Sequence, residues 1–145
     1  MGDYKKIEQS HRLSSYQVRF PHWHGSNATR TPFGQWRTDG VVRWYQAYNA
    51  AKHSRYENFQ RANFKNLMDA MCGLVVILAS QFHTGDFGQS FFVSERGAGE
   101  GFDYAIGGYF LIKFPNDWAP EDRHSFDWRQ FGKVANPIQK FLYPL

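Results

Sequence analysis

The segment from Asn63 to Phe82 constrains the fold of this chain more than any other stretch. Asn63 is a good helix N-cap, and the residues after it predict a long helix. The following apolar side chains recur at helical spacing and form one stripe: Phe64, Leu67, Met68, Met71, Leu74, Val75 and Leu78. Because the second half is apolar all round, we expect this helix to be the most buried element. Its apolar run, Ala70 to Ala79, is too short to span a bilayer.

An earlier helix is predicted from about Asp39 to Arg55, with Asp39 or Thr38 as its cap. Trp44, Tyr48 and Ala51 fall at helical spacing and give it an apolar stripe. The segment YENFQRAN then reads as the turn between two helices. Residues 39–82 are therefore expected to form a helical hairpin.

The remaining segments have a different character. Residues 1–38 are irregular, with a short strand around Tyr16 to Phe20. Residues 83–145 form a β-rich tail in which SFFVS and FDYAIGGYFLIKF predict strands, and SERGAGEG predicts a flexible loop. That glycine run lacks the GK[ST] ending of a phosphate-binding loop. The expected fold is one α+β domain, residues 1–145, with a helical hairpin on a small antiparallel sheet in the C-terminal half.

Composition excludes general disorder, since 42% of the residues are hydrophobic, 19% are aromatic and only 21% are charged. The net charge of +4 permits a polyanionic partner without requiring one. The single cysteine, Cys72, cannot form an internal disulfide and is expected to be a buried, inert thiol. With a polar N-terminus that lacks the features of a signal peptide, the sequence predicts a reducing, cytoplasmic location.

A polar cluster follows the apolar stripe of the first helix and is the best candidate for chemistry. Asn49 and His53 are four residues apart, so they share one helix face, while Lys52 and Arg55 continue the line through Tyr48. A histidine that titrates near neutrality, beside cations that hold a phosphate, suits phosphodiester cleavage by proton transfer. The alternative is structural, with basic residues that cap a helix end and an Asn49 side chain that bonds across a helix pair.

The stretch RWYQAYNAAKHSR, followed by a turn and ANFKNLMDAMCGL, resembles HEPN-like helical domains over about residues 40–82. In that family four to six intervening residues separate a catalytic Arg from a His that follows it, and Asn commonly comes directly after the Arg. Asn49 and His53 match the Asn and His, and the resemblance implies that they are catalytic. Tyr48 occupies the Arg position, and with Lys52 and Arg55 it is expected to bind substrate.

The resemblance implies a protein that acts on or binds RNA, such as a toxin or antiviral-defence component. Its ribonuclease activity would be metal-independent, with no cofactor, and weak or lost because the motif Arg is missing. Since HEPN domains are bundles of four or more helices, the hairpin would be an incomplete bundle completed by a homodimer or another protein. The alternative is a non-catalytic interaction module or a subunit of a larger complex.

A third reading concerns His22 and His24 in PHWHG, which alternate as on a strand. That spacing places both rings on one side and is compatible with two zinc ligands. Nothing in the spacing nominates further ligands, and two loop histidines beside a packed Trp23 are the plainer interpretation.

Overall fold

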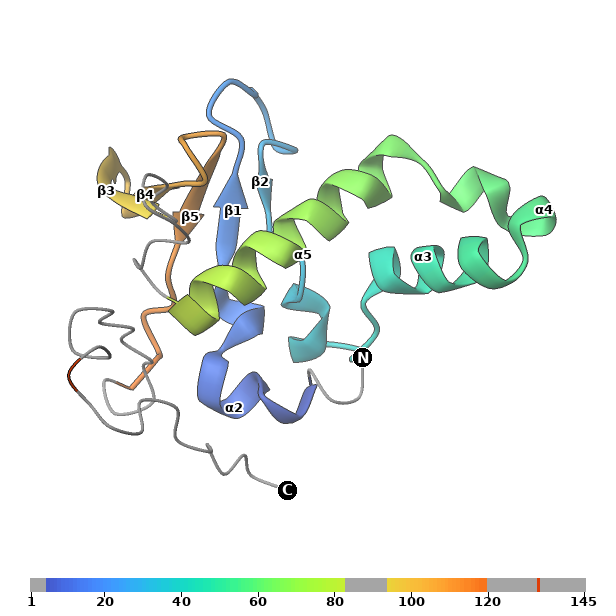
Figure 1. Ribbon diagram of the computed structural model, residues 1–145, viewed down its shortest axis with the longest axis horizontal. Coiled ribbons are helices and arrows are strands. Elements are labelled where there is room, and N and C mark those ends of the chain that lie inside the picture. Colours follow the sequence, from blue (N-terminus) through green and yellow to red (C-terminus); the bar gives the residue numbers. More distant parts are fainter. Residues whose placement is uncertain (1–4, 83–93, 120–132, 134–145) are drawn as a thin grey trace.

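The computed structural model describes residues 5–82, 94–119 and 133, and it has the α+β architecture that the sequence predicts (Figure 1). The elements follow in this order along the chain: α2 (Glu8–His11), the 3-10 helix η1 (Leu13–Ser15), β1 (Gln17–Arg19), β2 (Thr29–Arg30), the 3-10 helix η2 (Gly34–Arg37), α3 (Arg43–His53), α4 (Arg55–Asn58), the 3-10 helix η3 (Phe59–Arg61), α5 (Phe64–Phe82), β3 (Ser94–Gly99), β4 (Phe102–Ala105) and β5 (Phe110–Lys113).

The sheet is antiparallel, with the strand order β2-β1-β5-β4-β3. Val18 in β1 pairs with Arg30 of β2 on one side and with Ile112 of β5 on the other. The predicted strand around Tyr16 to Phe20 is therefore confirmed as β1. The expectation that residues 1–38 are otherwise irregular misses β2, because a two-residue strand is too short to show an alternating pattern.

The glycine-rich segment is not the flexible loop that its composition predicts. Its backbone forms β3 and a tight turn into β4. Gly99, Glu100 and Gly101 have φ angles of 82°, 53° and 77°. Two of these three left-handed positions are glycines, which adopt such angles without steric strain. The glycines therefore close a β-hairpin. The other predicted strand of the tail, SFFVS, lies outside the described residues except for Ser94.

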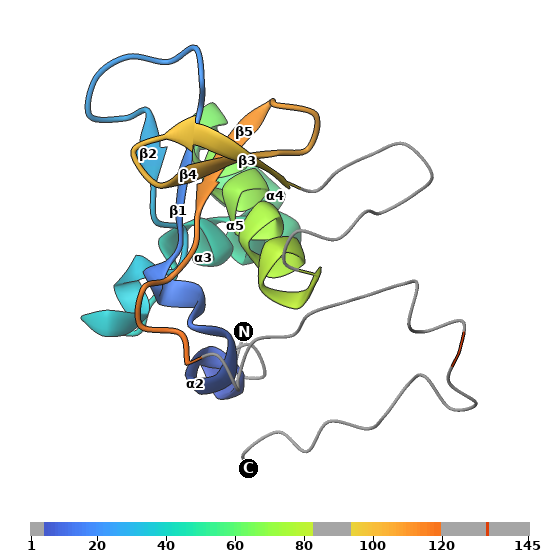
Figure 2. The same ribbon diagram turned by 90° about the vertical axis from the view of Figure 1, so that its left-hand side faces the viewer.

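Helix α5 lies against one face of this sheet (Figure 2). Its boundaries agree with the sequence, and Asn63 is confirmed as its cap, since Asn63 Oδ1 accepts a hydrogen bond of 3.0 Å from the Asn66 amide. The side of α5 that enters the core carries small and β-branched side chains: Cys72, Val75, Val76 and Ala79. These pack in one cluster with sheet residues that include Val18 and Ile112.

The opposite side of α5 is exposed, so the expectation of a helix buried all round is wrong. Leu74 is 56% exposed and Met71 is 40% exposed, and Phe64 and Leu67 are also exposed. The sheet covers only one side of α5, and α3 covers only part of a second side of the same helix. An all-round apolar sequence cannot say which side meets the core, and here the smaller residues allow the closer approach to the sheet.

Helix α3 is shorter than predicted at both ends. Gly40 has a φ of 72°, which no α-helix accommodates, so the helix starts at Arg43 instead of Asp39. Asp39 instead accepts a hydrogen bond from the Val41 amide and pairs with Arg43. At the other end Ser54 leaves the helical region, with a φ of −141°. The predicted turn after it contains α4 and η3.

Among the described helices, none is by itself long and apolar enough to cross a bilayer. The segments Arg55–Arg61 and Phe64–Phe82 reach that length and composition only when taken together, and they are bent by 79°.

Candidate functional site

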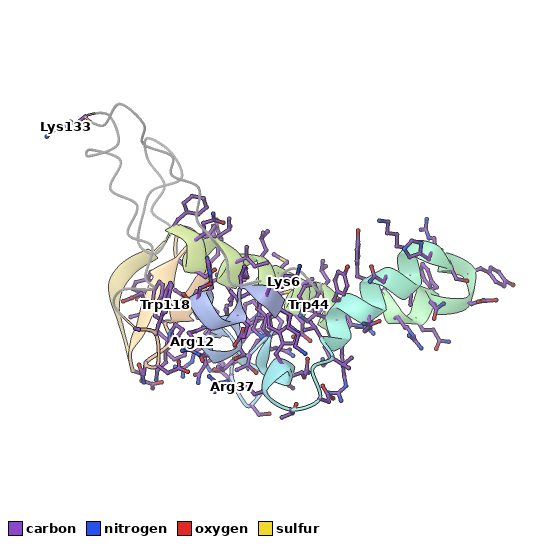
Figure 3. The ribbon with its side chains drawn as sticks, turned by 90° about the horizontal axis from the view of Figure 1, so that it is seen from below. Lys6, Arg12, Arg37, Trp44, Trp118 and Lys133 are labelled. Atoms are coloured by element: carbon purple, nitrogen blue, oxygen red, sulfur yellow. The ribbon has the colours of Figure 1, made fainter. Side chains whose placement is uncertain are left out.

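Residues 48–65 form an arm that extends away from the sheet (Figure 1). The arm consists of the second half of α3, then α4 and η3, and the first residues of α5. Figure 3 shows the same arrangement from below, with the arm on the opposite side of the labelled Trp44 from Arg12 and Trp118. The residues that the sequence nominates for RNA chemistry, Tyr48, Asn49, Lys52, His53 and Arg55, all lie on this arm.

His53 and Asn49 lie one helical turn apart on α3, as the spacing predicts. His53 is the last residue of the helix and is exposed, whereas Asn49 is half-buried. A hydrogen bond with the Asn49 side chain lowers the pKa of Tyr45 from its ordinary value, and the charge of Lys52 adds a smaller effect in the same direction.

The other predicted substrate-binding residues are only partly brought together. The Lys52 ammonium lies 5.9 Å from the centre of the Tyr48 ring, within reach of a cation–π interaction. Arg55, however, does not continue their line along α3, because the helix ends at His53 and Arg55 opens α4. The break at Ser54 places Arg55 on a separate helical segment, which sequence periodicity does not reveal.

The arm carries an excess of positive charge. Within the part of the chain that the structure describes, the cations Lys52, Arg55 and Arg61 have no carboxylate partner. The one carboxylate of residues 48–65, Glu57, accepts a hydrogen bond of 2.9 Å from the Ser54 hydroxyl. Several arginines outside the arm are paired with carboxylates, such as Arg19 with Glu100 and Arg37 with Asp117.

Apart from Tyr48, sequence reasoning nominated none of the aromatic side chains of the arm. Tyr56 is 99% exposed, and Tyr48, Phe59 and Phe64 are each more than half exposed. A signal was available in the segment RYENFQRANF, where rings alternate with cations in a polar turn. Rings placed outside a core are the residues that a partner can stack on.

A groove of about 470 Å³ separates α3 from the start of α5. Trp44, Tyr48 and Ala51 form one wall, so the apolar stripe predicted for the first helix faces this groove. Phe64 and Leu67 form the other wall, and Arg61 lies among the lining residues. The groove is therefore an apolar surface next to the cations of the arm.

The histidines of PHWHG do not lie on a strand. His22 and His24 are exposed in the connection between β1 and β2. Within residues 5–82, 94–119 and 133, no group of three or more His, Cys, Asp or Glu side chains is placed to hold a metal ion. The described residues therefore add no further ligands to this pair.

A buried polar network near the N-terminus was not foreseen. Ser10 Oγ lies 2.9 Å from His11 Nδ1, and both residues are buried. The Glu8 carboxylate accepts hydrogen bonds from the Ser14 amide and hydroxyl. The Trp118 indole donates to the Ser10 carbonyl at 2.7 Å. Since the network connects α2 and η1 to the segment after β5 and lies away from the surface, its evident role is to hold these segments together.

Cys72 is a buried free thiol, as the sequence predicts. Burial raises the pKa of its thiol to about 12, and the nearby Asp69 acts in the same direction. A thiol that stays protonated is a poor nucleophile. The expectation of an inert cysteine therefore agrees with its surroundings.

No family model, curated protein or solved structure matches this chain. The resemblance of residues 40–82 to HEPN-like domains accordingly stays a prediction.

Proposed function

We propose that this protein binds single-stranded RNA through the arm. The observation that carries the proposal is the alternation of exposed rings and uncompensated cations over residues 48–65. Proteins that bind single strands without sequence preference combine stacking surfaces with positive charge that follows the backbone. The arm offers both on one projecting element.

Lys52, Arg55 and Arg61 are the groups we assign to phosphates. Because no described carboxylate pairs with them, a phosphate would not have to displace an existing ion pair. Arg43 lies on α3, as Lys52 does, and is also exposed. It differs in that its guanidinium is paired with the Asp39 carboxylate at 2.9 Å. It therefore provides a matched control.

Tyr56 is the ring we assign to base stacking, because almost none of its surface is used within the protein. A stacked base is held by about 1–3 kcal/mol. Phe59, exposed on the same arm, would extend the stacking surface. Tyr109 in the β4–β5 turn is an exposed ring away from the arm and serves as the control.

As a finer proposal, His53 supplies metal-independent cleavage of the bound strand, as in a HEPN-like toxin or antiviral-defence component. The 2′-hydroxyl would attack the adjacent phosphorus and give its proton to His53, and the leaving 5′-oxygen would then take a proton from His53. Asn49, one turn before His53 on the same helix, would orient the phosphate. With Tyr48 at the Arg position, negative charge in the transition state lacks one cation, so we expect slow cleavage.

Binding is tested by fluorescence anisotropy with an unstructured RNA of about 12 nucleotides, titrated at several salt concentrations. Lys52→Ala and Arg55→Ala should each reduce the slope of log K against log salt by about 0.7, the value for one lost phosphate contact on a single strand. Arg43→Ala should leave the slope unchanged. Equal slopes for all four proteins would contradict phosphate contacts on the arm.

The stacking role is tested in the same assay. Tyr56→Ala should weaken binding by about 5- to 150-fold, which corresponds to about 1–3 kcal/mol, without lowering thermal stability. Tyr109→Ala should bind as the parent does. If both variants keep the parent affinity, stacking on the arm is refuted.

The cleavage proposal has a separate readout. His53→Ala should abolish RNA cleavage in EDTA while it retains RNA binding. Tyr48→Arg should increase cleavage, and since Tyr48 is 55% exposed, the arginine can be accommodated without a buried charge. Cleavage that survives His53→Ala would remove the catalytic assignment but leave the binding proposal intact.

A second candidate function, a non-catalytic protein-interaction module, is favoured by the apolar groove between α3 and α5. Grooves of this size that are lined by aromatic and aliphatic side chains are typical of binding sites. If the parent protein shows no salt-dependent RNA binding, this second candidate replaces the first.

A further inference from the structure

The exposed side of α5 carries a regular apolar seam. Its members are separated by three, four, three and four residues along the helix: Phe64, Leu67, Met71, Leu74 and Leu78. This is the spacing of the apolar a and d positions in the coiled-coil heptad, where helices pair side by side with a mean period of 3.5 residues. Leu78 is half-buried, and the other four are exposed. A stripe of this period fits another helix better than it fits an irregular surface.

We infer that the occupant of this seam is a second copy of the same chain, paired through α5 across a twofold axis. In a twofold interface the same patch meets itself, so the patch must be self-complementary. The seam meets this condition, because α5 has no charged residue after Asp69. The two charges near its start, Lys65 and Asp69, pair with each other at 2.8 Å. Two copies can therefore meet without burying an unpaired charge.

The available area is consistent with a small dimer interface. The four exposed seam residues present on the order of 400 Å² of apolar surface, which is the size of the largest apolar patch on an ordinary monomer, a patch that is often a binding surface. A dimer that pairs two such seams would bury about 800 Å² in total, which is below the standard size of specific interfaces, so we expect a weak, concentration-dependent dimer.

Charge selects the direction of pairing. The cations of the arm lie at the N-terminal end of α5. Parallel pairing would bring the two sets of Lys52, Arg55 and Arg61 to the same end, where they repel. Antiparallel pairing separates them and sets Met71 against Leu74 of the second copy and Leu67 against Leu78. The inference is thus an antiparallel α5 dimer, and it does not depend on RNA binding.

The assembly is tested by sedimentation of the full chain over a range of concentrations. The parent should approach twice the 17.0 kDa mass of one chain as the concentration rises, and Leu74→Asp should have the mass of one chain with an unchanged circular dichroism spectrum. Tyr109→Asp adds the same charge at an exposed ring outside the seam and should stay dimeric. A monomeric parent, or a Leu74→Asp variant that still dimerises, would overturn the inference. So would a monomeric parent that floats with lipid vesicles, which would assign the seam to a membrane surface.

Disulfide trapping tests the direction. Because the two Leu67 positions are far apart in an antiparallel pair, Leu67→Cys alone should not cross-link, whereas a chain with both Leu67→Cys and Leu78→Cys should form a covalent dimer on oxidation. The native Cys72 is buried and should not interfere. Cross-linking of the single Leu67→Cys variant would overturn the antiparallel arrangement.

Discussion

Gly73 lies where the Trp44 ring of α3 meets α5, and its replacement by alanine sets two effects against each other. A Cβ at this position would lie 2.8 Å from Trp44 Cζ2 and 3.4 Å from Cη2, and the first distance is too short for two carbon atoms. Trp44 cannot easily move away, since its indole donates a hydrogen bond of 2.9 Å to the Pro32 carbonyl. Its ring also packs edge-on against Phe33, with 5.9 Å between the ring centres.

The magnitude follows from the two opposing terms. Alanine is favoured over glycine in a helix interior by about 1 kcal/mol. Overpacking a well-packed site costs about 1–3 kcal/mol, and the fixed ring places Gly73→Ala in the upper part of that range. We therefore expect a net loss of about 1–2 kcal/mol in the free energy of unfolding, or a decrease of roughly 4–8 °C in Tm.

Urea denaturation followed by circular dichroism measures this loss, and a double-mutant cycle assigns it to the contact. Trp44→Phe removes the two ring atoms that the new Cβ would approach. In that background Gly73→Ala should no longer destabilise and should gain part of its helix propensity. If Gly73→Ala is as stable as the parent, α3 does not pack on α5 through Trp44 and the reasoning fails.

Three further predictions concern the interior. Asp69→Asn should lower the free energy of unfolding by about 3 kcal/mol, because Arg30, whose guanidinium lies 3.2 Å from Asp69 and is also mostly buried, loses its charged partner. Asp39→Asn, at an exposed ion pair, should lower it by less than about 0.5 kcal/mol. Equal losses for the two variants in urea denaturation would contradict a buried Arg30–Asp69 pair. Because burial raises the pKa of Cys72 from 9.0 to about 12, stability from its neutral thiol is present below pH 9.0 and decreases above it. The urea midpoint should therefore fall more between pH 8 and pH 10 for the parent than for Cys72→Ser, and an equal fall would refute this. Val76→Asp places a charge at a fully buried position and should prevent folding, so a cooperative thermal transition in this variant would show that the core is misassigned.

Local chemistry made much of the fold predictable from the sequence. The start of α5 depends on the Asn63 side chain and its hydrogen bond to the next turn, which a sequence shows directly. The strand around Val18 was recognisable from its β-forming residues. FDYAIGGYFLIKF, expected as one strand, is divided into β4 and β5 by a turn in which Gly107 and Gly108 have φ angles of 63° and 80°. The positions of Asn49 and His53 on one face of α3 follow from helical periodicity alone.

Other features depend on contacts between segments that are distant in the sequence. Strand β2 exists because Arg30 pairs with Val18, and its two residues carry no pattern of their own. Arg55 leaves the line of Tyr48 and Lys52 because α3 ends at His53, a boundary that no capping residue marks. The exposure of Tyr56, Phe59 and Phe64 likewise could not be predicted, since an aromatic residue in a sequence is expected in the core.

The side of α5 that is buried is the clearest case of a choice made only by the tertiary structure. The sequence determines that this segment is a helix and that it is apolar all round. It does not determine the orientation, since Leu74 and Val76 are equally suited to a core. The sheet accepts the side with Cys72, Val76 and Ala79, whose small volumes permit close packing, and the larger leucines remain outside. The neighbouring elements decide which side of such a helix is buried, because the hydrophobic effect depends on the apolar area removed from water and not on direction.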